Sequence, residues 1–254
     1  MSVSNRTLQI QALRTRIFHA RESLDEFVIS QVPKSHVREN MILAVTSKIV
    51  SLAEGRLQSR NEISKSDLIA REAEHSLGEI GYGSILTIKE GLFIASAGID
   101  ESNSESGDYI LYPENPFDSA KALRDRLATS WQLKNFGVLL TDSHTTPLRL
   151  GVTGLSLAYW GFSGLQDRVG SKDLFGRPLQ MTKVNVADGL GAAATLMMGE
   201  SDESRPLACI WDADVEFTTE TDPTELRVAL EDDLYYPFFR PHLSGPAKPP
   251  SGSR

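Results

Sequence analysis

Apolar residues recur along the chain with two different periods, and the period indicates which element forms. Alternation of apolar and polar residues, or a short apolar run, predicts a strand. The predicted strands cover residues 7–13, 41–45, 84–89, 92–97, 136–140, 179–186 and 206–211. The strands on either side of Glu90-Gly91 are expected to pair as a hairpin, because a glycine-containing turn separates them.

Helical spacing of apolar residues predicts four helices, at residues 21–31, 64–77, 117–131 and 187–198. Ser64 or Ser66 could cap the second helix, since acidic residues follow in its early turns. Helices and strands are interleaved without a strict βαβ rhythm, so we expect an α+β fold with two lobes.

The two ends of the chain differ in composition from its body. We expect residues 1–243 to form one unit, whereas the tail at residues 244–254 (SGPAKPPSGSR) is expected to be disordered, because its Pro, Gly, Ser and Lys residues cannot build a core. The N-terminus lacks the apolar centre of a secretory signal, which predicts a cytoplasmic protein.

Composition narrows the class of protein. Apolar residues make up 40% and charged residues 24% of the chain, which is typical of a soluble globular protein. No apolar run approaches the roughly 20 residues that cross a bilayer, so no membrane partner is expected. The net charge is −8 without a dense Lys/Arg cluster, which argues against nucleic-acid binding. The single cysteine, Cys209, excludes an intrachain disulfide and lies in a predicted buried strand, LACIW.

The familiar nucleotide, metal and nucleophile motifs are absent. The chain has no G-x-x-x-x-G-K-[ST], no H-E-x-x-H, no C-x-x-C and no G-x-S-x-G. Gly189-Leu190-Gly191 begins like a dinucleotide fingerprint, but it follows Asp188 inside a helical pattern and lacks the third glycine. Close helix packing is the better interpretation, so neither a P-loop nor a Rossmann fold is expected.

Oxygen-rich side chains follow several predicted strands. Residues 96–104 (SAGIDESNS) offer Asp100, Glu101 and Asn103 within four positions. A hard divalent cation prefers such donors. On spacing alone, a solvated acidic turn is the favoured interpretation.

Two more strand ends carry polar groups. Residues 141–147 (TDSHTTP) place Asp142 and Ser143 side by side, with hydroxyl groups that could bond phosphate or form local caps. Residues 46–48 (TSK) could hold a base, ribose or phosphate, or could form a turn with an exposed lysine.

The last two candidate segments are the basic loop at residues 168–177 (RVGSKDLFGR) and residues 198–201 (MGES) after the last helix. The loop could neutralise an anionic substrate, or could be solvated. Gly199 is an ordinary helix stop, and Glu200 is a ligand or an exposed side chain. Each signal is weak alone, but their common placement at strand ends predicts one composite site.

At these same residues the chain resembles the coenzyme F-420-0:L-glutamate ligases, or gamma-glutamyl ligases. The matching motifs occur in family order over about residues 8–211: VTSKIVSLAEGR (45–56), AGIDESN (97–103), LYPENPFDSA (111–120), GVLLTDS (137–143), GSKDLFGRPLQMTKVNVAD (170–188) and MMGE (197–200). The resemblance implies a two-lobed mixed-sheet fold, a homodimer, two divalent cations (Mg²⁺ or Mn²⁺), GTP in preference to ATP, and L-glutamate as amine donor. It leaves room for K⁺ as a further ion.

The resemblance also implies residue roles. The implied metal ligands are Asp100, Asp142, Ser143 and Glu200. The implied nucleotide contacts are Arg14, Ile17, Ser47, Lys48, Asn103 and Gly199. Asp100 and Asp142 are expected to act at the reacting centre together with Arg149, which could hold a carboxylate, as could Lys172 and Arg177.

Two departures from the family pattern leave the acceptor open. Leu52 stands where the family usually has Lys, and residues 144–151 (HTTPLRLG) replace the usual Gly-Arg and later Arg-Arg-Gly. This pattern resembles a bacterial branch described as folate gamma-glutamate ligases. Three hypotheses follow: ligation to an F-420 precursor, the same ligation to folate, or a non-catalytic protein that binds a small anion.

The expected chemistry explains why no nucleophile motif is needed. Amide formation from a free carboxylate is uphill in water, so the γ-phosphoryl group would first pass to the acceptor carboxylate. The glutamate amine would then attack the acyl phosphate. Phosphoryl transfer depends on positioning and charge neutralisation, which two metals bridging Asp100, Asp142 and the phosphates would supply.

Overall fold

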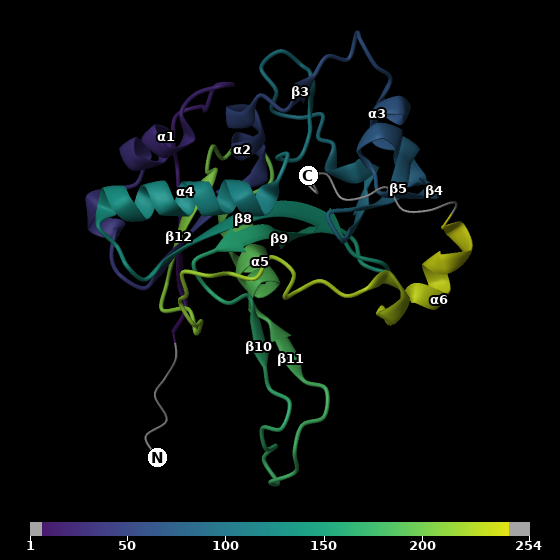
Figure 1. The fold of residues 1–254 in the computed structure, drawn as a ribbon. Coiled ribbons are helices and arrows are strands. Elements are labelled where there is room, and N and C mark those ends of the chain that lie inside the picture. Colours follow the sequence, from purple (N-terminus) through teal and green to yellow (C-terminus); the bar gives the residue numbers. More distant parts are fainter. Residues whose placement is uncertain (1–6, 244–254) are drawn as a thin grey trace.

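The computed structural model describes residues 7–243 and contains a five-stranded mixed sheet covered by helices on both faces (Figure 1). The strands lie in the order β1 (Gln9–Leu13), β12 (Leu207–Trp211), β2 (Met41–Thr46), β8 (Phe136–Thr145) and β9 (Val152–Trp160). Within this sheet β2 and β8 are parallel, and the other neighbouring pairs are antiparallel. This topology confirms an α+β fold.

The central strand β2 shows why both faces need a helix layer. Met41, Leu43 and Val45 pack on one face, and Ile42 and Ala44 on the other, and all five are fully buried. Successive side chains of a strand point to opposite faces, so a continuous apolar run requires cover on both.

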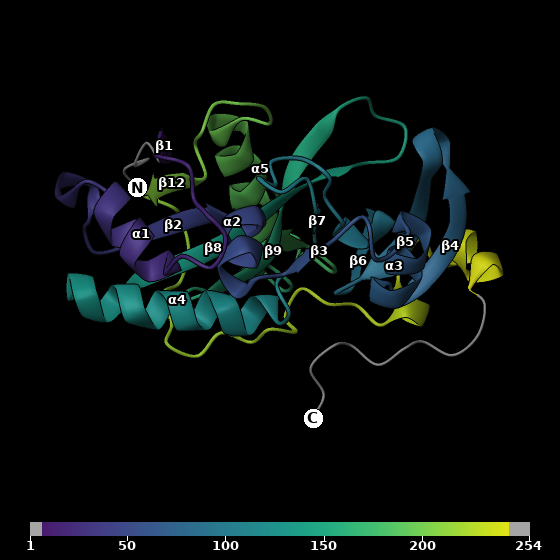
Figure 2. The same cartoon turned by 90° about the horizontal axis from the view of Figure 1, so that it is seen from above.

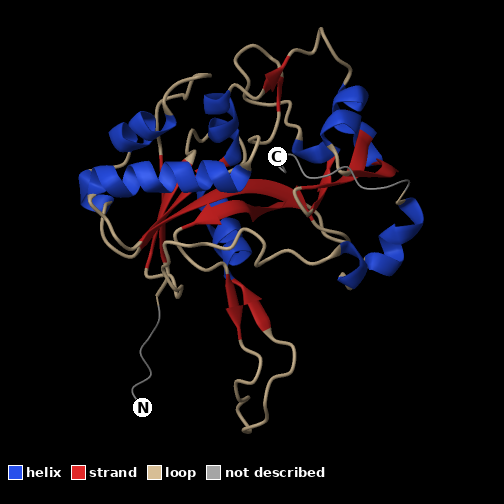
Figure 3. Cartoon of the chain, viewed as in Figure 1, coloured by secondary structure: helices blue, strands red, loops and turns tan. Residues whose placement is uncertain are grey.

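The helix layers are visible above and below the sheet in Figure 3. One face is covered by α1 (Leu24–Gln31), α2 (Ser47–Glu54) and α4 (Pro116–Trp131). The other face is covered by α5 (Val186–Met198). Gly191 lets α5 approach closely, because a Cβ there would lie 2.7 Å from the Leu155 carbonyl carbon. The packing interpretation is therefore confirmed for Gly191 and wrong for Gly189, which has open space around its Cα.

A second, smaller sheet lies beside the first, as the view from above shows (Figure 2). It consists of β4 (His75–Ile80), β5 (Ser84–Lys89) and β6 (Leu92–Ala95), and α3 (Lys65–Glu72) lies next to it. The short strands β3 (Leu57–Gln58) and β7 (Tyr109–Ile110) pair between the two regions. Leu68 and Ile69 of α3 share a separate small core with Ile99, Tyr109 and Leu111.

Two further segments extend over or away from the sheets. Strands β10 (Leu165–Asp167) and β11 (Lys183–Asn185) form a projecting two-stranded arm (Figure 1). After β12 the chain runs across the molecule to α6 (Tyr236–Phe239), next to the small sheet. Phe239 lies 6.0 Å from Phe93 of β6, between ring centroids.

Many of the predicted elements are confirmed, with small shifts at their ends. They are β1, α1, β2, the β5–β6 hairpin, α4, α5 and β12. Ser64 caps α3 by accepting a hydrogen bond from the Asp67 N–H. Cys209 is fully buried in β12, and burial raises the pKa of its thiol to about 12. No helix in residues 7–243 is long and apolar enough to span a bilayer.

Three predicted elements are wrong in extent. The helix expected over 64–77 ends at Glu72, and residues 75–80 form β4 because they pair with β5. The strand expected over 179–186 is reduced to Lys183–Asn185, whose side chains are exposed on the arm. The strand expected over 136–140 continues to Thr145, because residues 141–145 pair with β9, a strand that the sequence did not predict.

Two sequence-based expectations concern segments outside these elements. The basic segment at residues 168–177 is confirmed as a loop, and it forms part of the tip of the arm between β10 and β11. The predicted disordered tail, residues 244–254, lies outside the described residues.

Candidate functional site

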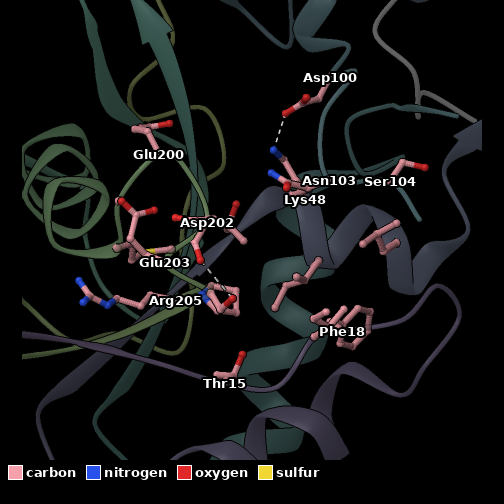
Figure 4. A pocket seen from close by; sticks show the side chains of 18 of the residues that line it. Thr15, Phe18, Lys48, Asp100, Asn103, Ser104, Glu200, Asp202, Glu203 and Arg205 are labelled. Carbon is pink, nitrogen blue, oxygen red and sulfur yellow. Dashed lines mark hydrogen bonds and ion pairs between the residues drawn. The ribbon is translucent and has the colours of Figure 1, made fainter. Parts of the chain in front are cut away.

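A cavity of about 740 Å³ opens at the end of β2, beside residues 141–143 of β8. In mixed sheets the carboxyl ends of parallel strands commonly form such crevices. Figure 4 shows side chains of the N-terminal segment, α2, the loop after β6 and the segment after α5 converging on it. Eight of the predicted site residues line the cavity: Ile17, Lys48, Asp100, Asn103, Asp142, Ser143, Gly199 and Glu200.

Lys48 and Asp100 form an ion pair across the cavity wall. Lys48 lies in the first turn of α2, and its Nζ is 2.6 Å from Oδ2 of Asp100 (Figure 4). The Ser102 N–H and hydroxyl both donate to Oδ1 of Asp100, over 2.6 and 2.8 Å. Burial opposes ionisation, but the Lys48 charge and these hydrogen bonds hold the pKa of Asp100 below its ordinary value. Asp100 is therefore ionised at neutral pH.

Asp142 lies in the paired part of β8 rather than in a loop, and its environment differs from that of Asp100. The Tyr112 hydroxyl donates to its Oδ2 over 2.5 Å. Burial raises the pKa of Asp142 to about 6, the Tyr112 hydrogen bond opposes this, and the nearby Asp100 charge raises it further. Among residues 7–243, no Lys, Arg or His forms an ion pair with Asp142. The charge of nearby Lys48 favours the ionised form, but burial outweighs this attraction and leaves the pKa raised.

Glu200 and Ser143 reach the cavity from the α5 side. Gly199 ends α5 with φ of 87°, a value that favours glycine, and the chain then turns to present Glu200. Burial raises the pKa of Glu200, and a hydrogen bond from Ser143 opposes the rise. Ser143, Asp142 and Glu200 thus place oxygen atoms on one region of the wall.

Several lining residues were not found from the sequence. They are Glu105, Asp202, Glu203, His19 and Arg205; Arg16, which also borders the cavity, lies within the segment Arg14 to Ile17 that the resemblance implied as a nucleotide contact. The segment that carries Arg205 directly precedes β12, next to the end of β2, so the strand-end argument could have found it. With Asp100, Asp142 and Glu200, six carboxyl groups face the cavity, against four basic side chains.

Other predicted residues lie elsewhere. Ser47 is buried at the start of α2, and Arg14 is exposed after β1; neither lines the cavity. Arg149 is exposed in the loop between β8 and β9. Lys172 and Arg177 lie on the arm, where Arg177 pairs with Asp173 over 2.9 Å. The structure therefore does not bring these three basic residues to the cavity within one chain.

The cavity has an apolar end. Ile17, Phe18, Ile49, Leu52 and Leu57 line it together. Leu52, the departure from the family pattern noted above, therefore contributes apolar surface at this end. A flat aromatic base would bury its faces well against such side chains.

The donor set suits a divalent cation that arrives with phosphate. Within the described residues, no three His, Cys, Asp or Glu side chains lie close enough to form a complete metal site. Mg²⁺ does not need such a cage, because it keeps several waters and uses one or two carboxylates together with substrate phosphates. Asp100, Asp142, Glu200 and the Ser143 hydroxyl supply the oxygen donors for that arrangement.

Comparison with known proteins matches the same region. A profile of the F420-0:Gamma-glutamyl ligase family matches residues 12–212. The chain belongs to this family. All the cavity-lining residues lie within the matched range, whereas residues 213–243, including α6, lie beyond it.

Curated relatives in this family come from methanogenic archaea, among others. A protein named coenzyme F420:L-glutamate ligase from Methanopyrus kandleri is 38% identical over 190 residues, covering 68% of this chain and 75% of its own. The protein of the same name from Methanococcus maripaludis strain S2 is 34% identical and covers 83% and 85%. That from Methanocaldococcus jannaschii is 32% identical and covers 85% and 92%.

Proposed function

We propose that the protein is an amide-forming ligase that adds L-glutamate to a coenzyme F420 precursor. The product is a γ-linked amide bond, and GTP is the energy source. The observation that carries the proposal is the cavity itself. It combines Asp100, Asp142 and Glu200 with Lys48 inside the segment that matches the family, whose relatives are named for this ligation.

The charge of the cavity supports a metal-dependent mechanism. Six carboxyl groups would repel a triphosphate unless cations lay between them. Bound at Asp100, Asp142, Ser143 and Glu200, Mg²⁺ or Mn²⁺ would neutralise phosphate charge and orient the γ-phosphoryl group. Burial raises the pKa of Asp142 to about 6, and this carboxyl forms no ion pair in the described residues. A bound cation would therefore stabilise its charged form.

The protein side chains have separable tasks in this proposal. Lys48 lies beside Asp100 and would donate to a phosphate oxygen, since an ammonium is a compact phosphate ligand. Asn103 borders the same wall.

The apolar end formed by Phe18, Ile49 and Leu52 would hold the purine base and exclude water from the reacting centre. Arg205, at the opposite wall, would hold a carboxylate of glutamate or of the acceptor.

The order of events follows from the need to activate a carboxylate. The acceptor carboxylate oxygen attacks the γ-phosphorus of GTP, the bond to the β-phosphate oxygen breaks, and GDP leaves. The neutral glutamate amine then attacks the acyl carbon, the C–O bond to phosphate breaks, and phosphate departs while the nitrogen gives up a proton to solvent as the amide bond forms. Neither step needs a protein nucleophile, which agrees with a cavity lined by charge-balancing groups.

Folate is the second candidate acceptor. The observation that favours it is the loop at residues 144–151, which departs from the family pattern and leaves Leu148 and Leu150 fully exposed. Two exposed leucines beside the single Arg149 suit a different acceptor from the one that an arginine-rich loop would hold.

One experiment separates the three hypotheses. The purified protein is incubated with GTP, Mg²⁺ and L-glutamate, together with either the deazaflavin precursor or a reduced folate, and the products are identified by mass spectrometry. A glutamylated deazaflavin supports the proposal, and a glutamylated folate supports the second candidate. If neither product forms and GTP does not bind in the presence of Mg²⁺, the ligase proposal is wrong and a non-catalytic anion-binding role replaces it.

A further inference from the structure

A buried tyrosine contacts the candidate metal ligand Asp142 from behind the cavity wall. The Tyr112 side chain is 4% exposed and does not line the cavity. Its hydroxyl donates to Oδ2 of Asp142 over 2.5 Å. Burial and the Asp142 charge both raise the pKa of Tyr112, so the hydroxyl keeps its proton and acts as a donor. The bond therefore orients the carboxylate without occupying the cavity.

The segment that carries Tyr112 also holds Asp100. The Ile110 N–H donates to the Asp100 carbonyl, and the Asp100 N–H donates to the Ile110 carbonyl, each over 2.9 Å. Asp100 follows the small sheet, whereas Asp142 belongs to β8 of the large sheet. Residues 110–112 thus connect two carboxylates that come from different parts of the fold.

This connecting segment is itself fixed. The Arg56 Nε donates to the Tyr112 carbonyl over 2.9 Å, and the Leu111 N–H donates to the Arg56 carbonyl over 3.0 Å. The ring of Tyr112 passes directly over Gly98, where a Cβ would lie 2.2 Å from the ring carbon Cζ. Gly98 also has φ of +69°, which favours glycine. The close approach to Gly98 restricts where the ring can lie, and the positive φ is a second reason for glycine at this position.

We infer that Tyr112 is a positioning residue, which fixes the orientation of the Asp142 carboxylate and its placement relative to Asp100. In this arrangement both carboxylates can bind a cation that also binds a phosphate group. This inference rests on the proposed function, because it concerns the same cation. Groups that orient metal ligands typically contribute about 10–100-fold to metal affinity or activity.

The test compares two phenylalanine variants. Tyr112→Phe removes the hydroxyl and keeps the ring. The matched control is Tyr159→Phe, since Tyr159 is also buried and its hydroxyl donates to a carboxylate, Oε1 of Glu225, over 2.7 Å. Neither Tyr159 nor Glu225 borders the cavity. The control therefore reports what the loss of a buried tyrosine–carboxylate hydrogen bond does by itself.

Two binding measurements give readouts other than activity. The Kd for Mn²⁺ alone is obtained from the electron paramagnetic resonance signal of free Mn²⁺, and the Kd for the Mn²⁺–GTP complex is obtained by calorimetry. We expect Tyr112→Phe to weaken both by about 10–100-fold, whereas Tyr159→Phe leaves both at the wild-type values. Melting temperatures of the two variants are compared to confirm that both are folded.

A double variant shows whether Tyr112 acts through Asp142. In an Asp142→Asn background, adding Tyr112→Phe should change neither Kd further, since the oriented carboxylate is already gone. Additive losses would overturn the inference, as would equal effects of Tyr112→Phe and Tyr159→Phe. A wild-type protein that binds neither Mn²⁺ nor Mn²⁺–GTP would overturn the proposed function and the inference with it. A wild-type protein that binds them, with Tyr112→Phe unchanged, would overturn the inference alone.

Discussion

At the scale of single residues, burial destabilises the charged form of the Asp142 carboxyl when no cation is bound. Burial raises the pKa of this carboxyl from its ordinary value near 3.8 to about 6. Between these two values the folded protein binds more protons than the unfolded chain, so its stability falls as the pH rises. Above pH 6 the loss is complete, at roughly 2–3 kcal/mol for a shift of this size and less where solvent screens the charge.

Asp142→Asn should therefore stabilise the protein in EDTA at pH 7.5. The neutral amide keeps an oxygen that can accept from Tyr112, and it removes the buried charge and its repulsion with Asp100. At pH 4, where the wild-type carboxyl is protonated, the two proteins should melt at similar temperatures. Thermal denaturation at both pH values is the measurement, and a variant less stable than wild type at pH 7.5 would contradict this account of Asp142.

Residue-scale patterns found some of the charged residues of the candidate site, but not its other charged residues or the tyrosine that contacts Asp142. Asp100 and Asp142 follow predicted strands and Glu200 follows a predicted helix; each signal is weak alone, and it is the match to family motifs that distinguishes these three residues. Tyr112 lies in the matching motif LYPENPFDSA, but the motif alone assigns it no role, since a single tyrosine is most simply interpreted as a core residue, and its ring does pack in the core. Its role follows from the approach of its hydroxyl to a strand 30 positions further along the chain.

At the scale of elements, the Glu225 carboxylate is one of the groups that attach the segment after β12 to the large sheet, beside backbone bonds such as that from the Ser163 N–H to the Glu216 carbonyl. Glu225 accepts hydrogen bonds from the Tyr159 hydroxyl, the Ser163 hydroxyl and the Gly164 N–H. Further along, Arg227 lies 3.4 Å from Glu90, next to the β5–β6 turn. The segment thus runs from the large sheet to the small one, outside the part of the chain that matches the family.

Replacing Glu225 should show how much this attachment stabilises the fold. Glu225→Ala leaves three donors without their acceptor, which we expect to lower the free energy of unfolding by about 2–3 kcal/mol. The matched control is Glu231→Ala, because Glu231 is exposed in the same segment. Urea denaturation of both variants is the measurement; equal midpoints would mean that Glu225 does not anchor the segment.

Elements with a clear apolar period could be predicted from the sequence. Strands whose extent depends on pairing with another strand could not. The run Met41–Val45 and the hairpin turn at Glu90-Gly91 are local signals, and both elements formed as expected. Strand β9 mixes Thr, Gly and Ser with apolar residues, so its period is weak, and its pairing with β8 is what extends β8 beyond Leu140. Because that extension depends on pairing with β9, which has no clear period of its own, the sequence interpretation placed Asp142 in a loop instead of a strand.

At the scale of the whole molecule, the arm exposes apolar residues that a monomer would leave in water. Leu174 is fully exposed, and Phe175 and Met181 are each 82% exposed. Exposed apolar groups of this kind mark contact surfaces. We propose that the arm contributes to a homodimer interface, the assembly expected from the family resemblance.

Light scattering tests this assembly. The wild-type protein should have about twice the mass of one chain at micromolar concentration. Replacing Leu174 and Phe175 by Glu should yield a monomer with an unchanged far-ultraviolet circular dichroism spectrum, because neither side chain packs in a core. A wild-type monomer, or a charged variant that remains dimeric, would rule out this role of the arm.

The central claim is that the cavity transfers the γ-phosphoryl group of GTP with the help of cations held by Asp142. The most direct measurement is the rate of L-glutamate-dependent GDP release by the wild-type protein and by Asp142→Asn, with Mg²⁺ and the deazaflavin precursor present. We expect the variant to be slower by about 100-fold or more, since a lost charge contact at a reacting centre costs about 3–4 kcal/mol. Glu101→Gln is the matched control, because Glu101 is an acidic neighbour of Asp100 that does not line the cavity; its rate should equal that of the wild type. Equal rates for Asp142→Asn and the wild type would contradict the account.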